Sequence, residues 1–245
     1  MESIRTFDII GAIAYTAYYA VLVGVLVGFS PARRSTKIAL AAAAALWGVI
    51  VVTIAGFGLG APGAAGPVPI PVVAFAVFFA LLFLAWGARP QFRDALLSVP
   101  LPALVAVNVG RIAGILMALS TAQGRISAPF GPAAGWGDTL TGALAIPVAV
   151  IAAKRPQNRG WVFAWNLLGA ADLIDAVTLG ALSAPGTPFR VFTEGPGTGA
   201  MGTLPWIIVP TMLVPLLFLV HFTIAIKLRF VQRAPQAVPM VRSAT

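Results

Sequence analysis

Seven stretches of mostly apolar residues follow one another along the chain, and each is long enough to cross the hydrocarbon core of a bilayer. A transmembrane helix needs roughly 20 apolar residues, and it satisfies its backbone hydrogen bonds internally, as a spanning segment must. The sequence therefore predicts an all-α, polytopic membrane protein with seven transmembrane helices in one domain, residues 1–245. The expected spans cover residues 7–29, 37–58, 69–86, 101–120, 133–153, 161–182 and 204–227.

The composition agrees with a membrane protein and excludes several other classes. Hydrophobic residues make up 59% of the chain and charged residues only 9%, whereas about 25% of the residues of a soluble domain are charged. The lipid bilayer is thus the expected partner. The chain has no cysteine, which excludes disulfides, thiolate metal sites and cysteine catalysis.

Lysine and arginine lie almost entirely in alternate gaps between the spans. Twelve lie in the gaps after spans one, three and five or in the carboxyl-terminal tail, and three lie on the other side. Because cytoplasmic loops carry the excess of positive charge, we expect a protein of the cell membrane with its amino terminus outside and its carboxyl terminus inside the cell. The net charge of +9 does not indicate nucleic acid, since these residues flank apolar runs and would meet anionic lipid head groups. The twelve are Arg33, Arg34, Lys37, Arg89, Arg93, Lys154, Arg155, Arg159, Lys227, Arg229, Arg233 and Arg242; the three are Arg5, Arg125 and Arg190.

Two further features concern the membrane interface. Residues 91–98 are polar enough to form a helix at the interface between spans three and four. Tryptophans are enriched where a span meets the head groups, so four of them are expected to be interfacial anchors: Trp86, Trp136, Trp161 and Trp206.

Four charged residues lie inside the predicted spans and away from their ends. Arg111 lies near the centre of span four, Asp172 and Asp175 in span six, and Asp138 about 7 Å inside the outer end of span five. A charge at the bilayer centre costs at least about 2.5–3.5 kcal/mol, so it should face the bundle interior and find a partner. We expect Arg111, with Asn108 on the same helix face, to pair with Asp172, Asp175 or Asp138. One arginine leaves negative charge over, so at least one carboxyl is expected to be protonated or to bind a cation.

Two interpretations of this cluster stay open. A buried Arg–Asp pair can simply hold helices in register. The surplus of acids favours a binding or proton-relay site, to which the tyrosines of span one are added as candidates. Tyr15, Tyr18 and Tyr19 share one helix face, and their hydroxyls need partners, for which the inward acids are the expected acceptors; packing is the alternative role.

The single histidine, His221, lies in the inner third of span seven. It is expected to be a hydrogen-bonded side chain, with an axial haem ligand or a proton relay as the sharper alternatives. A single histidine excludes bis-histidine haem sites and zinc sites built from three histidines. Span seven contains no lysine that would form a retinal Schiff base, because Lys227 lies at its inner end.

Prolines and glycines modify three of the spans. Pro147 is expected to kink span five, and Pro205, Pro210 and Pro215 to kink span seven, each freeing a backbone carbonyl that is either unused or available to an ion. Small residues spaced by four mark close helix contacts. Gly110 and Gly114 have this spacing beside Arg111, and Thr141 and Gly142 lie on the face of span five that carries Asp138.

One short string resembles an enzyme motif. Gly135-Trp136-Gly137-Asp138 reads G-x-G-D, which resembles the second catalytic motif of intramembrane aspartyl proteases and prepilin peptidases. In those families a second aspartate lies on an earlier span. Here the earlier aspartate, Asp8, lies at an outer helix end, and a glycine-rich helix start explains the string equally well.

A wider stretch is similar to a group of bacterial multi-span membrane proteins of unknown function. The similarity covers about residues 104–182 and rests on three strings: 108–111 (NVGR), 129–138 (PFGPAAGWGD), and Trp165-Asn166 through Asp172. It implies that Arg111, Asp138 and Asp172 recur together. It names no activity, substrate or cofactor.

Three classes of function are therefore carried forward. The first is binding or transport of a small solute or ion, coupled to protons, at the Arg111, Asp138 and Asp172/Asp175 cluster. The second is a non-catalytic subunit or scaffold in a homo- or hetero-oligomeric membrane assembly, for which the alanine-rich face at residues 41–45 is suited. The third is a membrane enzyme or a haem- or quinone-binding protein. A non-enzymatic role is favoured, no residue is assigned a catalytic role, and cofactor and metal are left unassigned.

Overall fold

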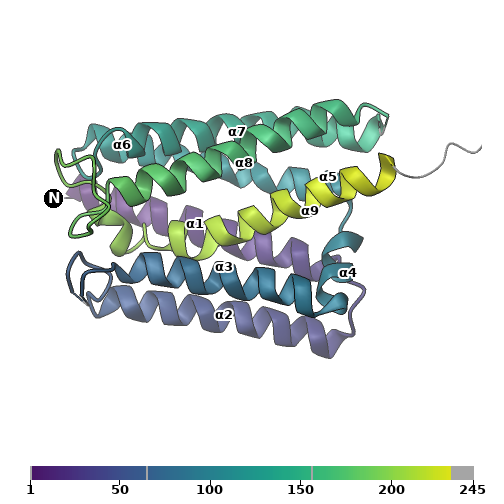
Figure 1. Ribbon diagram of the computed structural model, residues 1–245, viewed down its shortest axis with the longest axis horizontal. Helices are drawn as coiled ribbons and strands as arrows, with labels where there is room; N and C mark the ends of the chain where they lie inside the picture. The colour runs from purple at the N-terminus through teal and green to yellow at the C-terminus, as the bar shows by residue number, and fades with distance from the viewer. Residues whose placement is uncertain (1, 65, 156, 233–245) are drawn as a thin grey trace, which may run out of the picture.

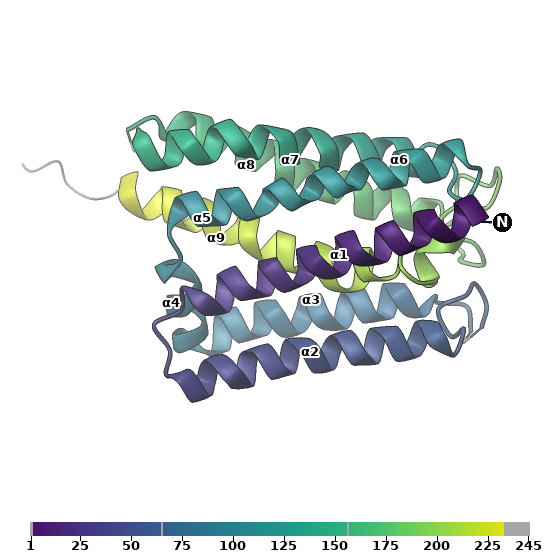
Figure 2. The same cartoon turned by 180° about the vertical axis from the view of Figure 1, so that it is seen from behind.

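The computed structural model describes residues 2–64, 66–155 and 157–232, and within them the chain is helical with no β-strand. Seven helical segments in this part of the chain are long and apolar enough to cross a membrane. They run alternately up and down as an antiparallel bundle (Figures 1 and 2). In chain order the elements are α1 (Glu2–Gly28), α2 (Arg34–Gly56), α3 (Ile70–Ala88), α4 (Pro90–Ser98), α5 (Leu101–Ala106), η1 (Val107–Gly114), α6 (Ile115–Ala122), α7 (Phe130–Lys154), α8 (Arg159–Leu182), η2 (Gly199–Gly202), η3 (Val209–Leu213) and α9 (Val214–Gln232).

The predicted spans match the observed helices closely, with one larger difference. Six of them agree within a few residues at each edge, and residues 91–98 fall in the short helix α4. The seventh begins at Val209 instead of residue 204, because residues 203–207 form turns ahead of it. Proline is tolerated in the first turn of a helix, where no N–H donor is needed, so Pro210 suits this later start.

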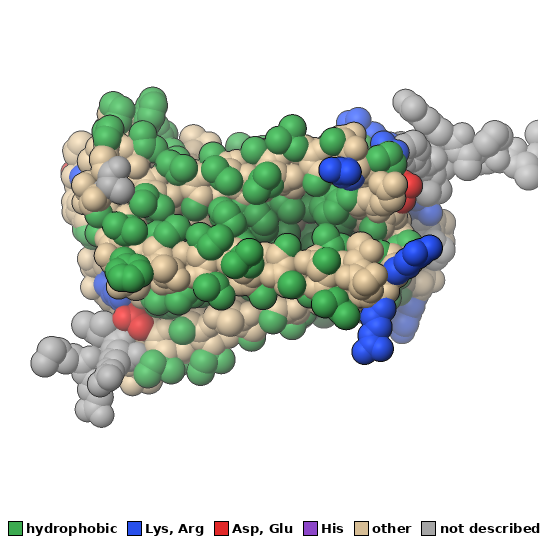
Figure 3. Space-filling model, turned by 90° about the horizontal axis from the view of Figure 1, so that it is seen from below, with side chains coloured by type: hydrophobic (Ala, Val, Ile, Leu, Met, Phe, Trp, Pro, Cys, Tyr) green, Lys and Arg blue, Asp and Glu red, His purple; other side chains and the backbone are tan. Residues whose placement is uncertain are grey.

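The two ends of the bundle differ in composition. One end, here called the glycine–proline end, holds the connections at residues 57–69, 123–129 and 183–208. The other, the basic end, holds α4 and the α1–α2 and α7–α8 connections (Figure 1). Apolar side chains cover most of the face seen in Figure 3, and most of its lysine and arginine side chains gather at the basic end. Ten of the twelve cations counted above lie within the described residues; Arg233 and Arg242 lie outside them.

Span seven is the centre of the bundle and α2 is its edge. In the most apolar window of each span, 72% of the residues of span seven are buried, against 6% for α2. Both ribbon views show α1 and α9 between a group formed by α5 to α8 and a pair formed by α2 and α3 (Figures 1 and 2). Side chains on α9 can therefore reach α8 as well as α3.

Two of the central spans depart from α-helical geometry. Span four contains the 3-10 segment η1, and such a segment inside a helix often marks a hinge or a functional site. A 3-10 helix has about three residues per turn, so Asn108, Arg111 and Gly114 fall on one line, and all three are buried. Span seven opens with the π-helical segment η3.

The backbone carbonyl of Thr211, inside η3, has a side-chain donor on another helix. Pro215 has no N–H to donate to the carbonyl of Thr211, four residues earlier. The indole N–H of Trp47, on α2, donates to that carbonyl instead, at 2.9 Å. The carbonyl freed by Pro215 is thus occupied by a side chain.

Trp206 corrects one expectation about interfacial anchors. Trp136 and Trp161 are exposed on the bundle surface, but Trp206 is completely buried. Its ring packs against those of Phe7 and Tyr15, and its indole N–H donates to Asp8 at 3.3 Å. The turns before span seven fold back under α1, which hydropathy along the sequence does not reveal.

Candidate functional site

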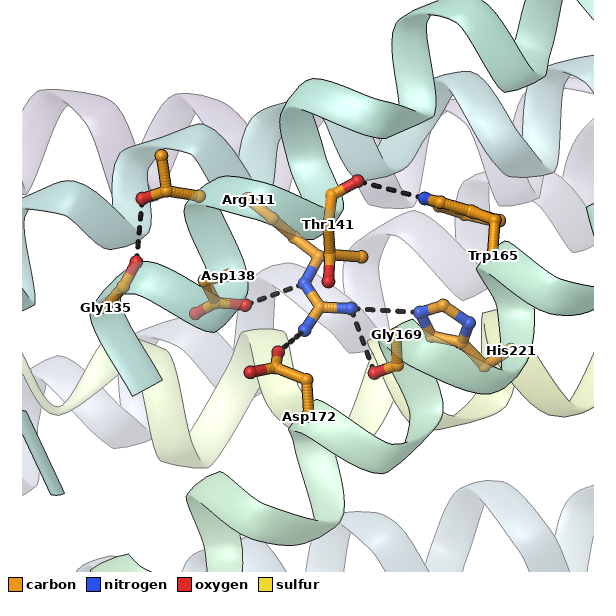
Figure 4. Close-up of polar contacts among 9 residues, drawn as sticks. Arg111, Gly135, Asp138, Thr141, Trp165, Gly169, Asp172 and His221 are labelled. Carbon is orange, nitrogen blue, oxygen red and sulfur yellow. Dashed lines mark hydrogen bonds and ion pairs between the residues drawn. The ribbon is translucent and has the colours of Figure 1, made fainter. Parts of the chain in front are cut away.

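Arg111 is the centre of a buried polar cluster that joins four spans. From η1 its Nε donates to Oδ1 of Asp138 on α7 at 2.7 Å, and its Nη2 donates to Oδ2 of Asp172 on α8. Its Nη1 donates to the carbonyl of Gly169 on α8 at 3.2 Å and contacts Nε2 of His221 on α9 at 3.0 Å. Figure 4 shows these groups converging on the guanidinium from three sides. The side chain of Arg111 has no exposed surface.

His221 joins this cluster as a neutral hydrogen-bond acceptor. Arginine can only donate, so Nε2 of His221 accepts from Arg111 and the ring proton is assigned to Nδ1. Nδ1 then donates to Oδ1 of Asn166 at 2.9 Å, and the amide of Asn166 donates back to the carbonyl of His221 at 3.2 Å. Both ring nitrogens are engaged, so a haem iron would have to displace one of these partners.

Glycines let the helices approach closely enough for these bonds to form. A methyl group on Gly169 would lie 2.8 Å from Nε2 of His221, and one on Gly137 would overlap Oδ1 of Asp172. A methyl on Gly135 would lie 2.6 Å from the backbone nitrogen of Ala118. The two glycines of the G-x-G-D string thus face different neighbours of α7, which accounts for the string by packing. The aspartate of the string forms an ion pair with Arg111, as does Asp172 on α8.

The glycine pairs predicted on spans four and five behave as expected for close contact. Methyl groups on Gly110 and Gly114 would overlap the ring of Tyr18 and Cβ of Asp138. One on Gly142 would lie 2.6 Å from the backbone nitrogen of Ile112. The buried hydroxyl of Thr141 has no hydrogen-bond partner among the described residues.

The tyrosine hydroxyls do not bind the buried acids, contrary to the expectation. Tyr15 donates to the carbonyl of Ala113 at 3.3 Å and Tyr19 to that of Ala44 at 3.0 Å. The hydroxyl of Tyr18 is buried without a partner in the described part of the chain. The tyrosines lie on α1, which packs against η1. Asp138 and Asp172 lie on α7 and α8, where they form ion pairs with Arg111.

Asp175 and Asn108 remain apart from the ion pairs. The side chain of Asp175 is exposed on α8 and makes no ion pair with the described residues. Residues three apart on a helix point about 60° apart, and Asp172 is the one turned toward Arg111. Asn108 is buried, donates to the carbonyl of Leu104 at 2.9 Å, and keeps an unpartnered Oδ1 among the described groups.

A cavity of about 150 Å³ extends from the glycine–proline end down to Asp138. Its walls come from α3, α6, α7 and α8, and from η2, η3 and their flanking turns. Among the described residues that line it, all are apolar apart from Thr198 and Asp138, and Asp138 is the only ionisable one. The carboxylate that pairs with Arg111 is therefore also the floor of a ligand-sized space.

The cluster carries more negative than positive charge. Asp138 and Asp172 face one guanidinium, and His221 is assigned as neutral, so the group has a net charge of −1 when both acids are ionised. No set of three or more histidine, cysteine, aspartate or glutamate side chains suited to a metal occurs in the described residues.

A second ion pair lies at the glycine–proline end, outside this cluster. Arg125 binds Asp8 through two hydrogen bonds of 2.6 and 3.1 Å and lies 5.4 Å from the centre of the Trp206 ring. Both charged side chains are partly exposed. This pair joins α1 to the loop after α6 and to the turns before span seven.

Sequence reasoning missed the pairing of His221 with Arg111 and the role of Asn166. Asn166 was named only as part of the string that resembles other membrane proteins. The spacing of residues along the chain does not tell how each helix is rotated about its own axis. A buried histidine and a buried asparagine on neighbouring central spans were the available signal, because each needs a polar partner.

Comparison with known proteins gives a family without an activity. No curated protein and no solved structure matches the chain significantly. A family model described as "Domain of unknown function (DUF8737)" matches residues 67–229. That range contains Arg111, Asp138, Asp172 and His221 and leaves out α1 and α2. Because the match covers more than half of its length, the chain belongs to this uncharacterised family, DUF8737.

Proposed function

We propose that this protein is a multi-pass membrane protein that binds a small solute in the cavity above Asp138 and moves it in exchange for protons. The observation that carries the proposal is the position of Asp138, which lines the cavity and is also an ion-pair partner of Arg111. A change in the protonation of this carboxyl would alter both the cavity floor and the contact between η1 and α7. Binding and helix position would thus be linked through one side chain.

The membrane and its orientation belong to the same proposal. Seven apolar helices and the gathering of cations at the basic end support a cell-membrane protein with its amino terminus outside. The glycine–proline end, where the cavity opens under the loops, would then face outward. The bacterial cytoplasmic membrane is the location that the sequence resemblance favours.

The test is a ligand screen on the purified protein in detergent. A ligand at about a hundred times its Kd stabilises the folded protein by about 2.7 kcal/mol, which is measurable as a rise in Tm. Small amines, carboxylic acids, sugars, amino acids and alkali cations would be tried on the wild type and on two variants. Asp138→Asn removes the cavity carboxyl, and Asp175→Asn removes an equal charge outside it.

At least one class of solute should raise the Tm of the wild type and of Asp175→Asn, but not that of Asp138→Asn. The same solute should then drive proton movement in liposomes that contain the wild type. The proposal is wrong if no class raises the Tm, or if Asp138→Asn responds as the wild type does.

One observation favours a second candidate, a subunit of a larger membrane assembly. Val51 is the one fully buried residue of α2, and the alanines at 41–43 and 45 face outward. Small residues on an exposed helix face suit close packing against another membrane helix. Co-purification of a partner chain or of a stable oligomer after mild extraction, lost on substituting Ala42 by Leu, would support this candidate; a monomer unaffected by the change would oppose it.

A further inference from the structure

We infer that the solute is a small lipophilic cation, an amine or ammonium compound with an apolar body about the size of one aromatic ring. It would bind to Asp138 in place of a proton. This inference rests on the proposed function and narrows it to one chemical class of ligand.

The walls of the cavity select an apolar body. Its lining is made largely of aliphatic and aromatic side chains, among them Phe75, Met117, Leu173 and Val177. These groups offer no hydrogen bonds to a sugar or an amino acid, whose polar groups would lose their water without compensation. The volume of about 150 Å³ matches a cavity that accommodates a benzene-sized molecule.

The charge of the floor selects a cation. Oδ1 of Asp138 accepts from Arg111, and Oδ2 accepts no hydrogen bond from the described residues. Asp138 also lines the cavity, so an N–H donor there would bind its carboxylate without displacing a protein group. An anion would meet this carboxylate first, because the Arg111 side chain behind it has no exposed surface.

Charge balance makes the proton and the ligand competitors. With both acids ionised the cluster needs one further positive charge, which a proton on Asp138 or a bound ammonium group would supply. When the ammonium binds, the O–H bond of the protonated carboxyl breaks and the proton passes to water, so one positive charge replaces another. The titratable and charged groups around Asp138 are Arg111 on η1, Asp172 on α8, His221 on α9, and Tyr15 and Tyr18 on α1. Asp175, also on α8, is not among the residues that line the cavity.

The experiment compares three ligands that share one ring and differ in charge: benzylammonium, benzyl alcohol and benzoate. Binding to the purified wild type would be measured by calorimetry, and proton release with a pH indicator in weak buffer. A hydrogen bond to a charged group predicts that benzylammonium binds about tenfold to a hundredfold more tightly than benzyl alcohol. It should release up to about one proton per ligand, and benzoate should not bind.

Two variants and one control variant test the position of the ligand. Asp138→Asn should bind benzylammonium no better than benzyl alcohol and release no proton, whereas Asp175→Asn should behave as the wild type. Val177→Phe fills the cavity without removing a charge, so both benzyl ligands should lose affinity. This variant keeps the test decisive if Asp138→Asn does not fold.

The outcomes separate the ligand class from the proposed function. If benzoate or benzyl alcohol binds as tightly as benzylammonium, or if binding releases no proton, the cation class is wrong. If these ligands fail while another solute stabilises the protein through Asp138, the class is wrong and the proposed function stands. If no solute responds to Asp138→Asn or Val177→Phe, both are wrong.

Discussion

Replacing Arg111 by methionine should destabilise the protein more than any other single loss of charge in the described residues. The change keeps an apolar side chain of similar length but leaves Asp138 and Asp172 facing each other without a cation. It also leaves the carbonyl of Gly169 and Nε2 of His221 without their donor. Removing one partner of a buried ion pair costs about 3–5 kcal/mol, and we expect a loss of free energy of unfolding in this range.

The triple variant Arg111→Met, Asp138→Asn, Asp172→Asn tests the reason for that loss. It removes all three charges while keeping side chains of similar shape. A buried charge without its partner is more costly than a neutral replacement of the whole group. The triple variant should therefore regain at least about 2 kcal/mol relative to Arg111→Met.

The free energy of unfolding would be measured in mixed dodecylmaltoside and sodium dodecyl sulfate micelles, followed by tryptophan fluorescence. Arg125→Met is the matched control, since Arg125 also binds an aspartate but in a partly exposed pair. Such pairs contribute about 0–1 kcal/mol. The reasoning is refuted if Arg111→Met costs no more than Arg125→Met, or if the triple variant is as unstable as Arg111→Met.

Two further variants test the helix contacts around this cluster by the same unfolding measurement. Trp47→Phe leaves the carbonyl of Thr211 without its side-chain donor and should lower the free energy of unfolding by about 1–3 kcal/mol. In a Pro215→Ala background, which restores a backbone N–H, the same change should lower it by less. An equal loss in both backgrounds would contradict the assignment. Gly169→Ala places a methyl group against the ring of His221 and should lower the free energy of unfolding by about 1–3 kcal/mol. Gly160→Ala on the same helix is the control, because no atom lies within 4 Å of its added methyl, and it should leave the free energy of unfolding nearly unchanged.

Hydropathy was sufficient for the number of helices and their approximate limits. A span must be long and apolar, and both properties are local, so six spans could be located within a few residues. The seventh span was predicted to begin at residue 204 instead of Val209, because the turns at residues 203–207 are apolar like a transmembrane helix. Within these turns Trp206 is buried by contacts with α1 and with Arg125, which lie far away in the sequence.

The cost of burying charge predicted that Arg111 would meet aspartates, but it did not predict which ones. Asp172 and Asp175 are separated by about 60° around α8, so a modest rotation of the helix decides which of them turns inward. That rotation is set by close contacts such as Gly137 against Asp172 and Gly169 against His221. The sequence shows these glycines but not which helix each one faces.

The structural and ligand-binding roles of the cluster are compatible because they use different sides of it. The contacts of Arg111 with Asp172, Gly169 and His221 hold η1 against α8 and α9, and His221 is fixed in turn by Asn166. The contact with Asp138 is the one that borders the cavity. Loss of the guanidinium should therefore affect stability first, whereas loss of the Asp138 carboxylate should affect ligand binding first. A cluster that only locked the helices would not need one of its aspartates to line an apolar cavity, and a binding site alone would not need four spans joined behind it.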